Sequence, residues 1–299
     1  MSEKVAVRHD LEHVSLSPPS ATSGLLEAFR RRYLLRLMVR REIQARYARS
    51  LLGLAWSYIN PTVRFFTFYF VFGIVIGRGM GIENFAIHLF AGMVLVHYFT
   101  ETVNSGTRSL LSNKGVVQKM SMPRELFPFA SMLVSLYHTI PQLIILTIAC
   151  LVTGWSHPDP VGFAAALLGF VLILLFGTAL GLMFSVFNVL FRDFGRIVQT
   201  FINMVPFVVP MMYPYSIITA RFGGVPAVHA IYLANPVAEA VLLIQRGFWW
   251  TTTDESYALS FPDDLWQRGF IMLGVCLVLL VLAQWVFSSL EGKVPELLT

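Results

Sequence analysis

The chain has 299 residues, of which 56% are hydrophobic and only 13% are charged, and its mean hydropathy is +0.67. Soluble domains carry about 25% charged residues, so this composition excludes a water-soluble globular protein and also a disordered one. The net charge is +5, and ten of the 22 lysines and arginines fall in the first 60 residues, beside apolar stretches. Basic residues in that position indicate membrane orientation, and they do not predict a nucleic-acid partner.

The chain begins with two segments of different character. Residues 1–23 are polar and lack the apolar core of a signal peptide, which predicts a disordered cytoplasmic tail. Residues 24–56 are predicted to form an amphipathic interface helix on the cytoplasmic surface of the membrane, because eight arginines stand there against two glutamates. The apolar residues that recur at helical spacing are Leu26, Phe29, Tyr33 and Leu37. Such a helix either only fixes the topology or also contacts a cytoplasmic partner.

Six apolar stretches are long enough to cross a membrane, for which a helix needs about 20 residues. They cover residues 57–77, 85–103, 126–153, 161–189, 197–218 and 266–288. A further apolar stretch, 228–250, is interrupted by Asn235 and Pro236, which favours two short helices that re-enter the membrane from outside. A seventh span in that stretch stays as the alternative. The predicted fold class is an all-α polytopic membrane protein with six transmembrane helices.

The predicted domains follow from these spans. The six-span permease domain covers residues 57–290, with a re-entrant outer segment over 214–265, and a cytoplasmic tail covers 291–299. With the N-terminus inside, the cytoplasmic segments and their edges hold 18 lysines and arginines, and the outer segments hold four. This distribution obeys the positive-inside rule. It predicts a multi-pass protein of the bacterial inner membrane with both termini in the cytoplasm.

The sequence contains no motif for catalysis or metal binding. It lacks a P-loop, a cluster of cysteine and histidine with metal-ligand spacing, and a Gly-x-Ser-x-Gly elbow. The chain is therefore not predicted to be an enzyme or to hold a metal. Its two cysteines, Cys150 and Cys276, lie in apolar runs and are predicted to be buried packing residues.

Ionisable residues inside the predicted spans are functional candidates. They are His88, His97, Glu101 and His138. A proton relay requires connected groups, and these four are scattered along the sequence, so we interpret the histidines as packing or interfacial residues. Glu101 lies near the cytoplasmic end of its span, where water or Arg108 could pair with it.

Aromatic residues crowd the first predicted span. Tyr58, Phe65, Tyr69 and Phe72 share one helical face, and aromatic rings stack on the apolar faces of sugars. These four residues are therefore candidates for the lining of a substrate channel. Contact with lipid or with neighbouring helices is the alternative interpretation.

The outer side contains a candidate gate. The fifth span holds Pro206, Pro210 and Pro214, and prolines kink helices and leave carbonyl groups unpaired. We assign the gate to Pro210, Tyr213, Asn235 and Pro236, with simple helix packing as the alternative. The loop tip 251–264 carries four acidic residues and is interpreted as a solvated loop.

Four stretches, in this order and spacing, resemble the permease subunits of ABC-2-type polysaccharide exporters, which export O-antigen, teichoic acid and capsule. The first, residues 41–61, is REIQARYARSLLGLAWSYINP, with its Leu-Gly-x-x-Trp and closing proline. The second, within residues 99–128, is SLLSNKGVVQKMSMPRELFP, and the third, residues 188–214, has Phe-Arg-Asp and a closing Tyr-Pro. The fourth is LANPVAEA, residues 233–240. The resemblance covers nearly all of residues 30–290.

The resemblance implies a homodimer with twelve spans around a central channel. Two copies of a separate nucleotide-binding ATPase subunit would hold ATP and Mg²⁺, and this chain would hold no cofactor. The segment from Asn113 to Met122 would be a coupling helix seated in the ATPase, and the interface helix and the loop 190–196 would complete the contact. The implied coupling residues are Asn113, Lys114, Gly115, Lys119, Arg124, Arg192 and Asp193, and those of the interface helix are Arg40, Arg41, Arg46 and Tyr47.

Three functions stay open. The leading one is export of a lipid-linked polysaccharide, with that glycan and membrane lipid as further partners. Scarce lysine with abundant arginine and tryptophan is typical of a high-GC genome, for which an actinobacterial cell-wall galactan or an O-antigen-like glycan is a candidate cargo. The first alternative, an ABC-2 permease for a small amphiphile or drug, predicts a less aromatic lumen and a closed apolar pocket. The second is an ion-coupled carrier acting alone, for which Glu101 is the available acid.

Overall fold

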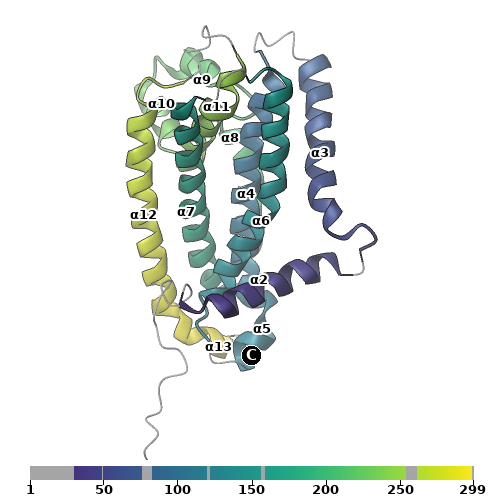
Figure 1. Cartoon of the computed structure of the whole chain (residues 1–299). Coiled ribbons are helices and arrows are strands. Elements are labelled where there is room, and N and C mark those ends of the chain that lie inside the picture. Colours follow the sequence, from purple (N-terminus) through teal and green to yellow (C-terminus); the bar gives the residue numbers. More distant parts are fainter. Residues whose placement is uncertain are drawn as a thin grey trace, which may run out of the picture.

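The computed structural model describes residues 30–48, 50–75, 83–119, 122–155, 159–253 and 261–297. Every regular element within these ranges is a helix, which agrees with the predicted all-α fold (Figure 1). The helices are α2 (Arg32–Tyr47), α3 (Trp56–Phe68), α4 (Phe85–Ser112), α5 (Lys114–Lys119), α6 (Leu126–Val152), α7 (Pro160–Leu190), α8 (Phe194–Val208), α9 (Tyr215–Phe222), α10 (Pro226–Leu233), α11 (Pro236–Phe248), α12 (Leu265–Leu290) and α13 (Val294–Leu297). The predicted tail 1–23 and two acids of the loop tip, Asp254 and Glu255, lie outside the described residues.

Helix α7 is the centre of the bundle, because α4, α11 and α12 all pack along it. Glycines bring the helix backbones into contact. A Cβ atom at Gly106 of α4 would stand 2.9 Å from the Cα atom of Gly181 in α7. One at Gly169 of α7 would stand 2.8 Å from the carbonyl oxygen of Ala240 in α11. Small residues at such contacts allow the close packing that holds helices together inside a membrane.

Within the described residues, four helices are long and apolar enough to cross a membrane. They are Phe85–Ser112, Leu126–Val152, Pro160–Leu190 and Leu265–Lys293. The bounds of α6, α7 and α12 agree within two residues with the predicted spans 126–153, 161–189 and 266–288. Helix α4 starts at residue 85 as predicted but continues to Ser112, because the polar residues after 103 keep helical hydrogen bonds beyond the apolar stretch.

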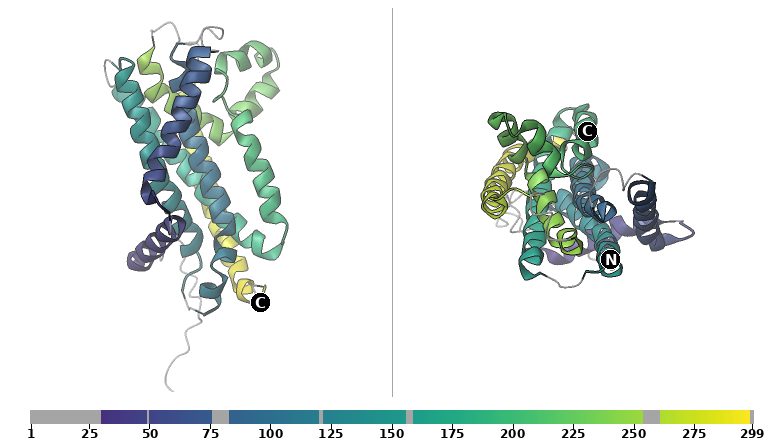
Figure 2. Two further views of the ribbon diagram at one scale, coloured as in Figure 1. Left: turned by 90° about the vertical axis from the view of Figure 1, so that its right-hand side faces the viewer. Right: turned by 90° about the horizontal axis from the view of Figure 1, so that it is seen from above.

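The predicted interface helix over 24–56 is wrong in its extent, because the described helix ends at Tyr47. The backbone leaves the helical conformation at Ala48, whose ψ is 130°, and then turns through Gly53. The φ of Gly53 is +50°, a left-handed conformation that favours glycine. A separate helix, α3, begins at Trp56 and stands apart from the bundle when the molecule is seen from above (Figure 2).

The predicted fifth span, 197–218, is also wrong in its bounds. Helix α8 ends at Val208, the chain is not helical over 209–214, and α9 begins at Tyr215. Proline cannot donate the backbone hydrogen bond that continues a helix, so the closely spaced prolines of this segment break it where only a kink was expected. Helices α10 and α11 follow as a pair. Together they are long and apolar enough to cross a membrane, but they are bent by 71° at the break between them.

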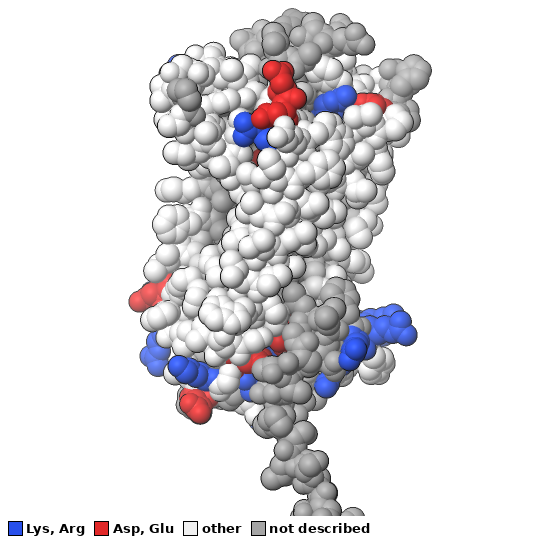
Figure 3. Space-filling model, turned by 90° about the vertical axis from the view of Figure 1, so that its left-hand side faces the viewer, with Lys and Arg blue, Asp and Glu red and all other residues white. Residues whose placement is uncertain are grey.

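On the face shown in Figure 3, the charged side chains lie toward the two ends and leave a broad, largely uncharged band between them. Helices α2, α5 and α13 lie at one end, and α9, α10 and the start of α12 lie at the other (Figure 1). An apolar band between two charged rims is the surface that a bilayer requires of a protein that crosses it several times.

Replacing Gly106 by alanine is expected to destabilise the fold, because the new Cβ atom would stand 2.9 Å from the backbone of Gly181. Overpacking of this kind costs about 1–3 kcal/mol, so the melting temperature of the purified protein should fall. Gly274→Ala is the matched control, since this glycine also lies inside a helix but has nothing within 4 Å of its Cβ position. If both variants melt at the same temperature, the contact between α4 and α7 does not limit stability.

Candidate functional site

Helix α2 lies across the lower end of the bundle and packs against α6 (Figure 1). The residues on its packed face are Leu34, Leu35, Met38 and Val39. The predicted apolar stripe is a different one: Tyr33 and Leu37 are 75% and 53% exposed. The helix carries apolar residues on two sides, and the sequence pattern does not distinguish which side meets the bundle. Arg40 and Arg41 are exposed, as expected for a surface that faces water or a partner.

An ion-paired cluster ties the C-terminal end of α2 to the bundle. The guanidinium of Arg46 donates a hydrogen bond to the carboxylate of Glu101 on α4. His138 on α6 completes the cluster, with its Nδ1 atom 2.9 Å from Glu101 Oε1 and 2.8 Å from Arg46 Nη1. The Glu101 side chain is only 15% exposed, and a carboxylate at that depth is stable only when it is paired.

Tyr47 extends this cluster to the start of α3. Its hydroxyl group bonds to Ser57 Oγ and lies 3.3 Å from His138 Nε2. The rings of Tyr47 and His138 also meet edge to face, with centroids 6.0 Å apart. The predicted interface residues Arg46 and Tyr47 therefore connect α2, α3, α4 and α6 at one point.

A cavity of about 340 Å³ opens beside the cluster. Its lining residues are Arg46, Tyr47, Trp56, Ser57, Asn60, Pro61, Arg64, His97, Glu101, His138 and Gln142. On its wall, His97 Nδ1 lies 3.1 Å from Gln142 Nε2 and 4.0 Å from Glu101 Oε2. Among the described residues no carboxylate pairs with Arg64, and Glu101 is already paired with Arg46. The cavity therefore carries one positive charge, that of Arg64, with no described carboxylate to balance it.

Three residues that the sequence shows as scattered are neighbours in this cluster. His97, Glu101 and His138 come together, and Arg46, which we did not expect there, neutralises Glu101 in place of Arg108. The spacing of four residues between His97 and Glu101 puts both on one helical face, and this is the signal that could have identified them. Arg108 instead donates to Gln199 Oε1 at 3.3 Å.

His88 does not belong to this cluster. It is buried between Phe85 and Trp249, with ring centroids 5.4 and 4.7 Å away, and so it is a packing residue as interpreted. Cys150 and Cys276 are buried as predicted. In the described part of the chain no group of three or more histidine, cysteine or acidic side chains could hold a metal ion.

The predicted coupling residues fall into two places at the lower end. Asn113 follows α4, and Lys114, Gly115 and Lys119 are exposed on the short helix α5. Arg192 and Asp193 form the exposed turn between α7 and α8. Both places are exposed at the surface.

Arg124 differs from the other predicted coupling residues. Its guanidinium donates a hydrogen bond to the backbone carbonyl oxygen of Glu291, which follows α12. The side chain is half-buried and fastens the start of α6 to the C-terminal segment. In this chain Arg124 therefore has a structural contact of its own.

Asn188 was not predicted and fixes the turn between α7 and α8. Its Nδ2 atom donates to the carbonyl oxygen of Thr107 in α4 at 2.9 Å. Its Oδ1 atom accepts from the backbone N–H of Gly195 in α8, also at 2.9 Å. The sequence signal for this role was the position of Asn188, a single polar side chain within the apolar residues that precede Phe191. The buried side chain joins three helices at one point.

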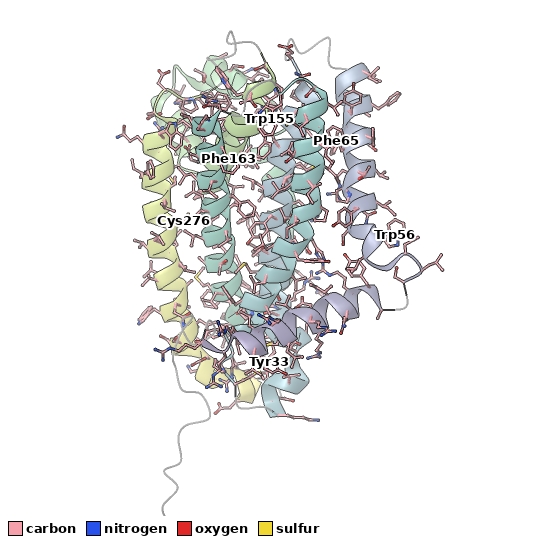
Figure 4. The ribbon with its side chains drawn as sticks, viewed as in Figure 1. Tyr33, Trp56, Phe65, Trp155, Phe163 and Cys276 are labelled. Carbon is pink, nitrogen blue, oxygen red and sulfur yellow. The ribbon has the colours of Figure 1, made fainter. Side chains whose placement is uncertain are left out.

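The predicted channel face on α3 divides into two kinds of residue. Phe65 packs against Phe90 of α4, with ring centroids 5.0 Å apart, and it is labelled between α3 and the bundle in Figure 4. Tyr58 and Tyr69 are 51% and 44% exposed. The side chain of Phe72 lies outside the described residues. The two tyrosines are thus accessible, whereas Phe65 is used to hold α3.

The predicted gate residues have local partners at the upper end. The carbonyl oxygen of Pro210 accepts from Gln245 Nε2 at 2.9 Å, and the hydroxyl of Tyr213 donates to the carbonyl oxygen of Phe207 at 3.2 Å. Asn235 caps α11, with its Oδ1 atom accepting the N–H of Val237 at 3.0 Å. Pro236 occupies the first helical position, where its missing N–H has no cost.

A second cavity of about 600 Å³ lies between α4, α7 and α8. Its walls are apolar and aromatic, with Phe99 and Phe176 stacked at 5.4 Å between centroids. Asn235, at the bend between α10 and α11, is the polar residue in its lining. The bend therefore reaches into the apolar interior of the molecule.

Replacing Glu101 by glutamine is expected to loosen α2, because Arg46 and His138 lose their shared carboxylate. A charge-assisted hydrogen bond contributes about 1.5–3 kcal/mol, so amide hydrogen exchange in the last two turns of α2 should rise about tenfold or more. Asp193→Asn is the control, since this carboxylate is 81% exposed and pairs with Arg196 of its own turn. If amide hydrogen exchange in α2 is the same in Glu101→Gln as in the unmodified protein, apolar packing alone holds the helix.

Comparison with known proteins identifies the family. Residues 33–249 match the family described as ABC-2 type transporter. The chain is 28% identical over 272 residues to the O-antigen export system permease protein RfbA of Myxococcus xanthus, which covers 90% of this chain and 97% of that protein. It is 23% identical over 265 residues to RfbA of Klebsiella pneumoniae, covering 89% and 95%. It is 20% identical over 207 residues to the polysialic acid transport protein KpsM of Escherichia coli, covering 68% and 78%. With this match and several helices that can cross a membrane, the chain belongs to the ABC-2 type transporter family as a multi-pass membrane subunit.

Proposed function

We propose that this chain is the permease subunit of an ATP-driven exporter that moves a lipid-linked polysaccharide across the bacterial inner membrane. The observation that carries the proposal is the match to an O-antigen export permease over 90% of this chain and 97% of that protein. A match of this extent covers the membrane helices, the coupling segments and the outer segment together. The cargo class of the relatives is therefore the best guide to the cargo of this chain.

In the proposed topology six helices cross the membrane and both termini face the cytoplasm. Helix α3, continued by η3 (Tyr69–Val75), and helix α8 add two spans to the four long helices. Helices α10 and α11 re-enter from outside. In support, α11 starts at depth, where Ala240 lies against Gly169, and ends beside Gly162 near the outer start of α7.

Two copies of the chain are proposed to form the channel. Helix α3 with its continuation η3, and helix α8, expose large apolar side chains, among them Phe66, Phe70, Phe201 and Phe207. A second copy related by a two-fold axis would cover part of these surfaces and enclose a channel that six helices packed on themselves cannot provide. Tyr58 on α3 and Tyr69 on η3 are exposed and would contact the glycan there.

ATP hydrolysis is assigned to two copies of a separate ATPase subunit, which would hold ATP and Mg²⁺. The whole sequence lacks a P-loop of its own. Helix α5, the turn between α7 and α8, and α2 lie at one end of the molecule and present basic side chains, among them Lys119, Arg192 and Arg40. Glu101 and Asn188 attach α2 and the turn to α4, so a displacement of these contacts reaches the membrane interior.

The cavity beside Arg46 is the proposed site for the phosphate linkage between lipid and glycan. Arg64 faces it from α3 without a described carboxylate partner, and an intramembrane arginine of this kind is a functional candidate. A phosphate or diphosphate supplies the missing anion, and guanidinium groups bind such oxygens well. A cell-wall galactan or O-antigen-like precursor has this chemistry.

The apolar cavity favours a second candidate function, export of a small amphiphile. Its volume of about 600 Å³ lies within the range of small-molecule pockets. The ion-coupled carrier receives less support, because Glu101 is tied to Arg46 and a carboxylate held in that pair does not readily exchange protons.

The function is tested by gentle purification of the chain from its native membranes. We expect an ATPase subunit at one-to-one stoichiometry and a phosphate-containing glycolipid in the extract. The ATPase with a small amphiphile would favour the second candidate. Transport by the chain alone, without an ATPase subunit, would contradict the ABC exporter. It would support the ion-coupled carrier, with Glu101 as its acid.

Charge reversal on α5 is expected to uncouple the exporter. Lys114→Glu with Lys119→Glu alters two exposed side chains of the coupling helix, so the fold should persist while docking to the ATPase fails. ATP hydrolysis in membranes should continue, and glycolipid export should fall about tenfold or more, the loss expected from like-charge contacts across an interface. Arg221→Glu, an exposed reversal on the outer helix α9, is the control. Normal export in the double variant would remove α5 from the mechanism.

Replacing Arg64 by glutamine is expected to lower export without loosening the bundle, because the residue has no described ion-pair partner. A lost charge-assisted contact to phosphate costs about 1.5–3 kcal/mol, which corresponds to about tenfold or more in apparent affinity for the glycolipid. Arg64→Lys keeps the charge and should retain part of the affinity. The measurement is glycolipid binding to purified protein, and equal binding by all three proteins would exclude Arg64 from the site.

A further inference from the structure

The outer half of the molecule contains a carboxyl group that nothing described above explains. Glu239 lies in the first turn of α11, and its side chain is 0% exposed. Neither of its carboxyl oxygens has a hydrogen-bond partner among the described residues. A buried polar group without a partner costs about 1–3 kcal/mol, and such groups in native proteins require an explanation.

Helix α11 packs against α12, whose first turns carry Arg268 and follow Asp264. A Cβ atom at Gly269, the neighbour of Arg268, would stand 3.4 Å from Leu243 Cδ1, and Leu243 is one turn after Glu239 in α11. Arg268 Nε donates to Asp264 Oδ1 at 2.7 Å, and this hydrogen bond lowers the pKa of Asp264, so that its carboxyl group is ionised at neutral pH. The pair lies toward the surface, with side chains 30% and 44% exposed. Arg268 therefore binds a partly exposed carboxylate, and it lies on the helix that packs against the one carrying the buried carboxyl group.

The other polar groups around this region come from α9 and α10. Tyr215 of α9 and His229 of α10 are joined, with the hydroxyl 2.8 Å from Nε2. Tyr232 of α10 is half-buried, and its hydroxyl group lies buried without a described partner. The two unpartnered groups, Tyr232 and Glu239, thus belong to the pair α10–α11, which bends by 71° between them.

We propose that Arg268 has two alternative partners: Asp264 in the arrangement described here, and Glu239 in a second arrangement of α10–α11 against α12. Packed helices shift past one another by up to about one turn, about 5.4 Å, in known transitions. In the second arrangement Glu239 gains charge-assisted hydrogen bonds at a depth where they are strong. The exchange holds the outer end of the protein in either of two positions, whatever cargo passes.

The exchange is tested by measuring the distance between α10 and α12 with pairs of spin labels. The labels replace Val228 and Phe270, which are 42% and 59% exposed, on the full-length chain in lipid nanodiscs. Asp264→Asn should move the populations about two- to fivefold toward the second distance, which is the range for an exposed ion pair. Glu239→Gln should deplete the second distance about tenfold or more, because it removes the buried partner.

Asp263→Asn is the matched control, since the neighbouring carboxylate makes no described bond to Arg268. It should leave the distance distribution as in the parent. If Glu239→Gln does not fold, Arg268→Gln tests the same point, because Asp264→Asn should then have no further effect in that background. One distance that neither Asp264→Asn nor Glu239→Gln alters would overturn the proposal. The distance measurement does not depend on export, so its result is independent of the proposed cargo.

Discussion

Close contact between helix backbones is the constraint on which this structure depends. Helix α7 touches α4 through Gly106 and Gly181 on one side and α11 through Gly169 on the other. Within a membrane the hydrophobic effect does not drive helices together, so the packing energy must come from such contacts. The result is one rigid group of helices. Helices α2, α3 and α8 are attached to it at fewer points, and these are the elements that carry the proposed functions.

Polar residues show where the attachments are. The interior offers no water, so each polar group must find a partner or be costly. The Oε1 atom of Glu101 is paired with Arg46 and His138, and Asn188 bonds to two backbone groups. Both lie where a loosely attached element meets the rigid group. Glu239 is the contrasting case, since its carboxyl oxygens have no partner among the described residues. The paired groups hold joints in place, and in the proposed exchange the unpaired carboxyl group of Glu239 marks a joint that has a second position.

Much of the fold was predictable because a long apolar stretch can adopt only a few stable arrangements. The stretches that became α6, α7 and α12 could only be buried or cross a membrane, and their bounds followed from composition. The break at Asn235 was also visible, since asparagine caps a helix that proline can begin. The bounds of α2 and α8 were missed because Gly53 and Pro210 were weighed less than the apolar pattern around them.

The candidate site was predictable only in its parts. Arg46 and Tyr47 were singled out from the resemblance, and Glu101 and His138 from their depth in apolar spans. Their meeting depends on the order in which α2, α4 and α6 pack, and Arg46 is 55 residues from Glu101 and 92 from His138 in the chain. No pattern of spacing contains that information. The face of α2 that meets the bundle was not predicted, for the same reason.

The hydrogen bonds of Asn188 have a thermodynamic consequence for any cytoplasmic partner. They fix the turn after α7 to Thr107 of α4, and the same helix carries Glu101, which holds α2 about two turns away. A partner that binds the turn therefore restricts the helix that positions α2, and one that binds α2 restricts the turn. The second contact then forms at a high effective concentration, as an intramolecular event. For a partner that contacts both surfaces, linkage then requires each contact to strengthen the other by the same factor.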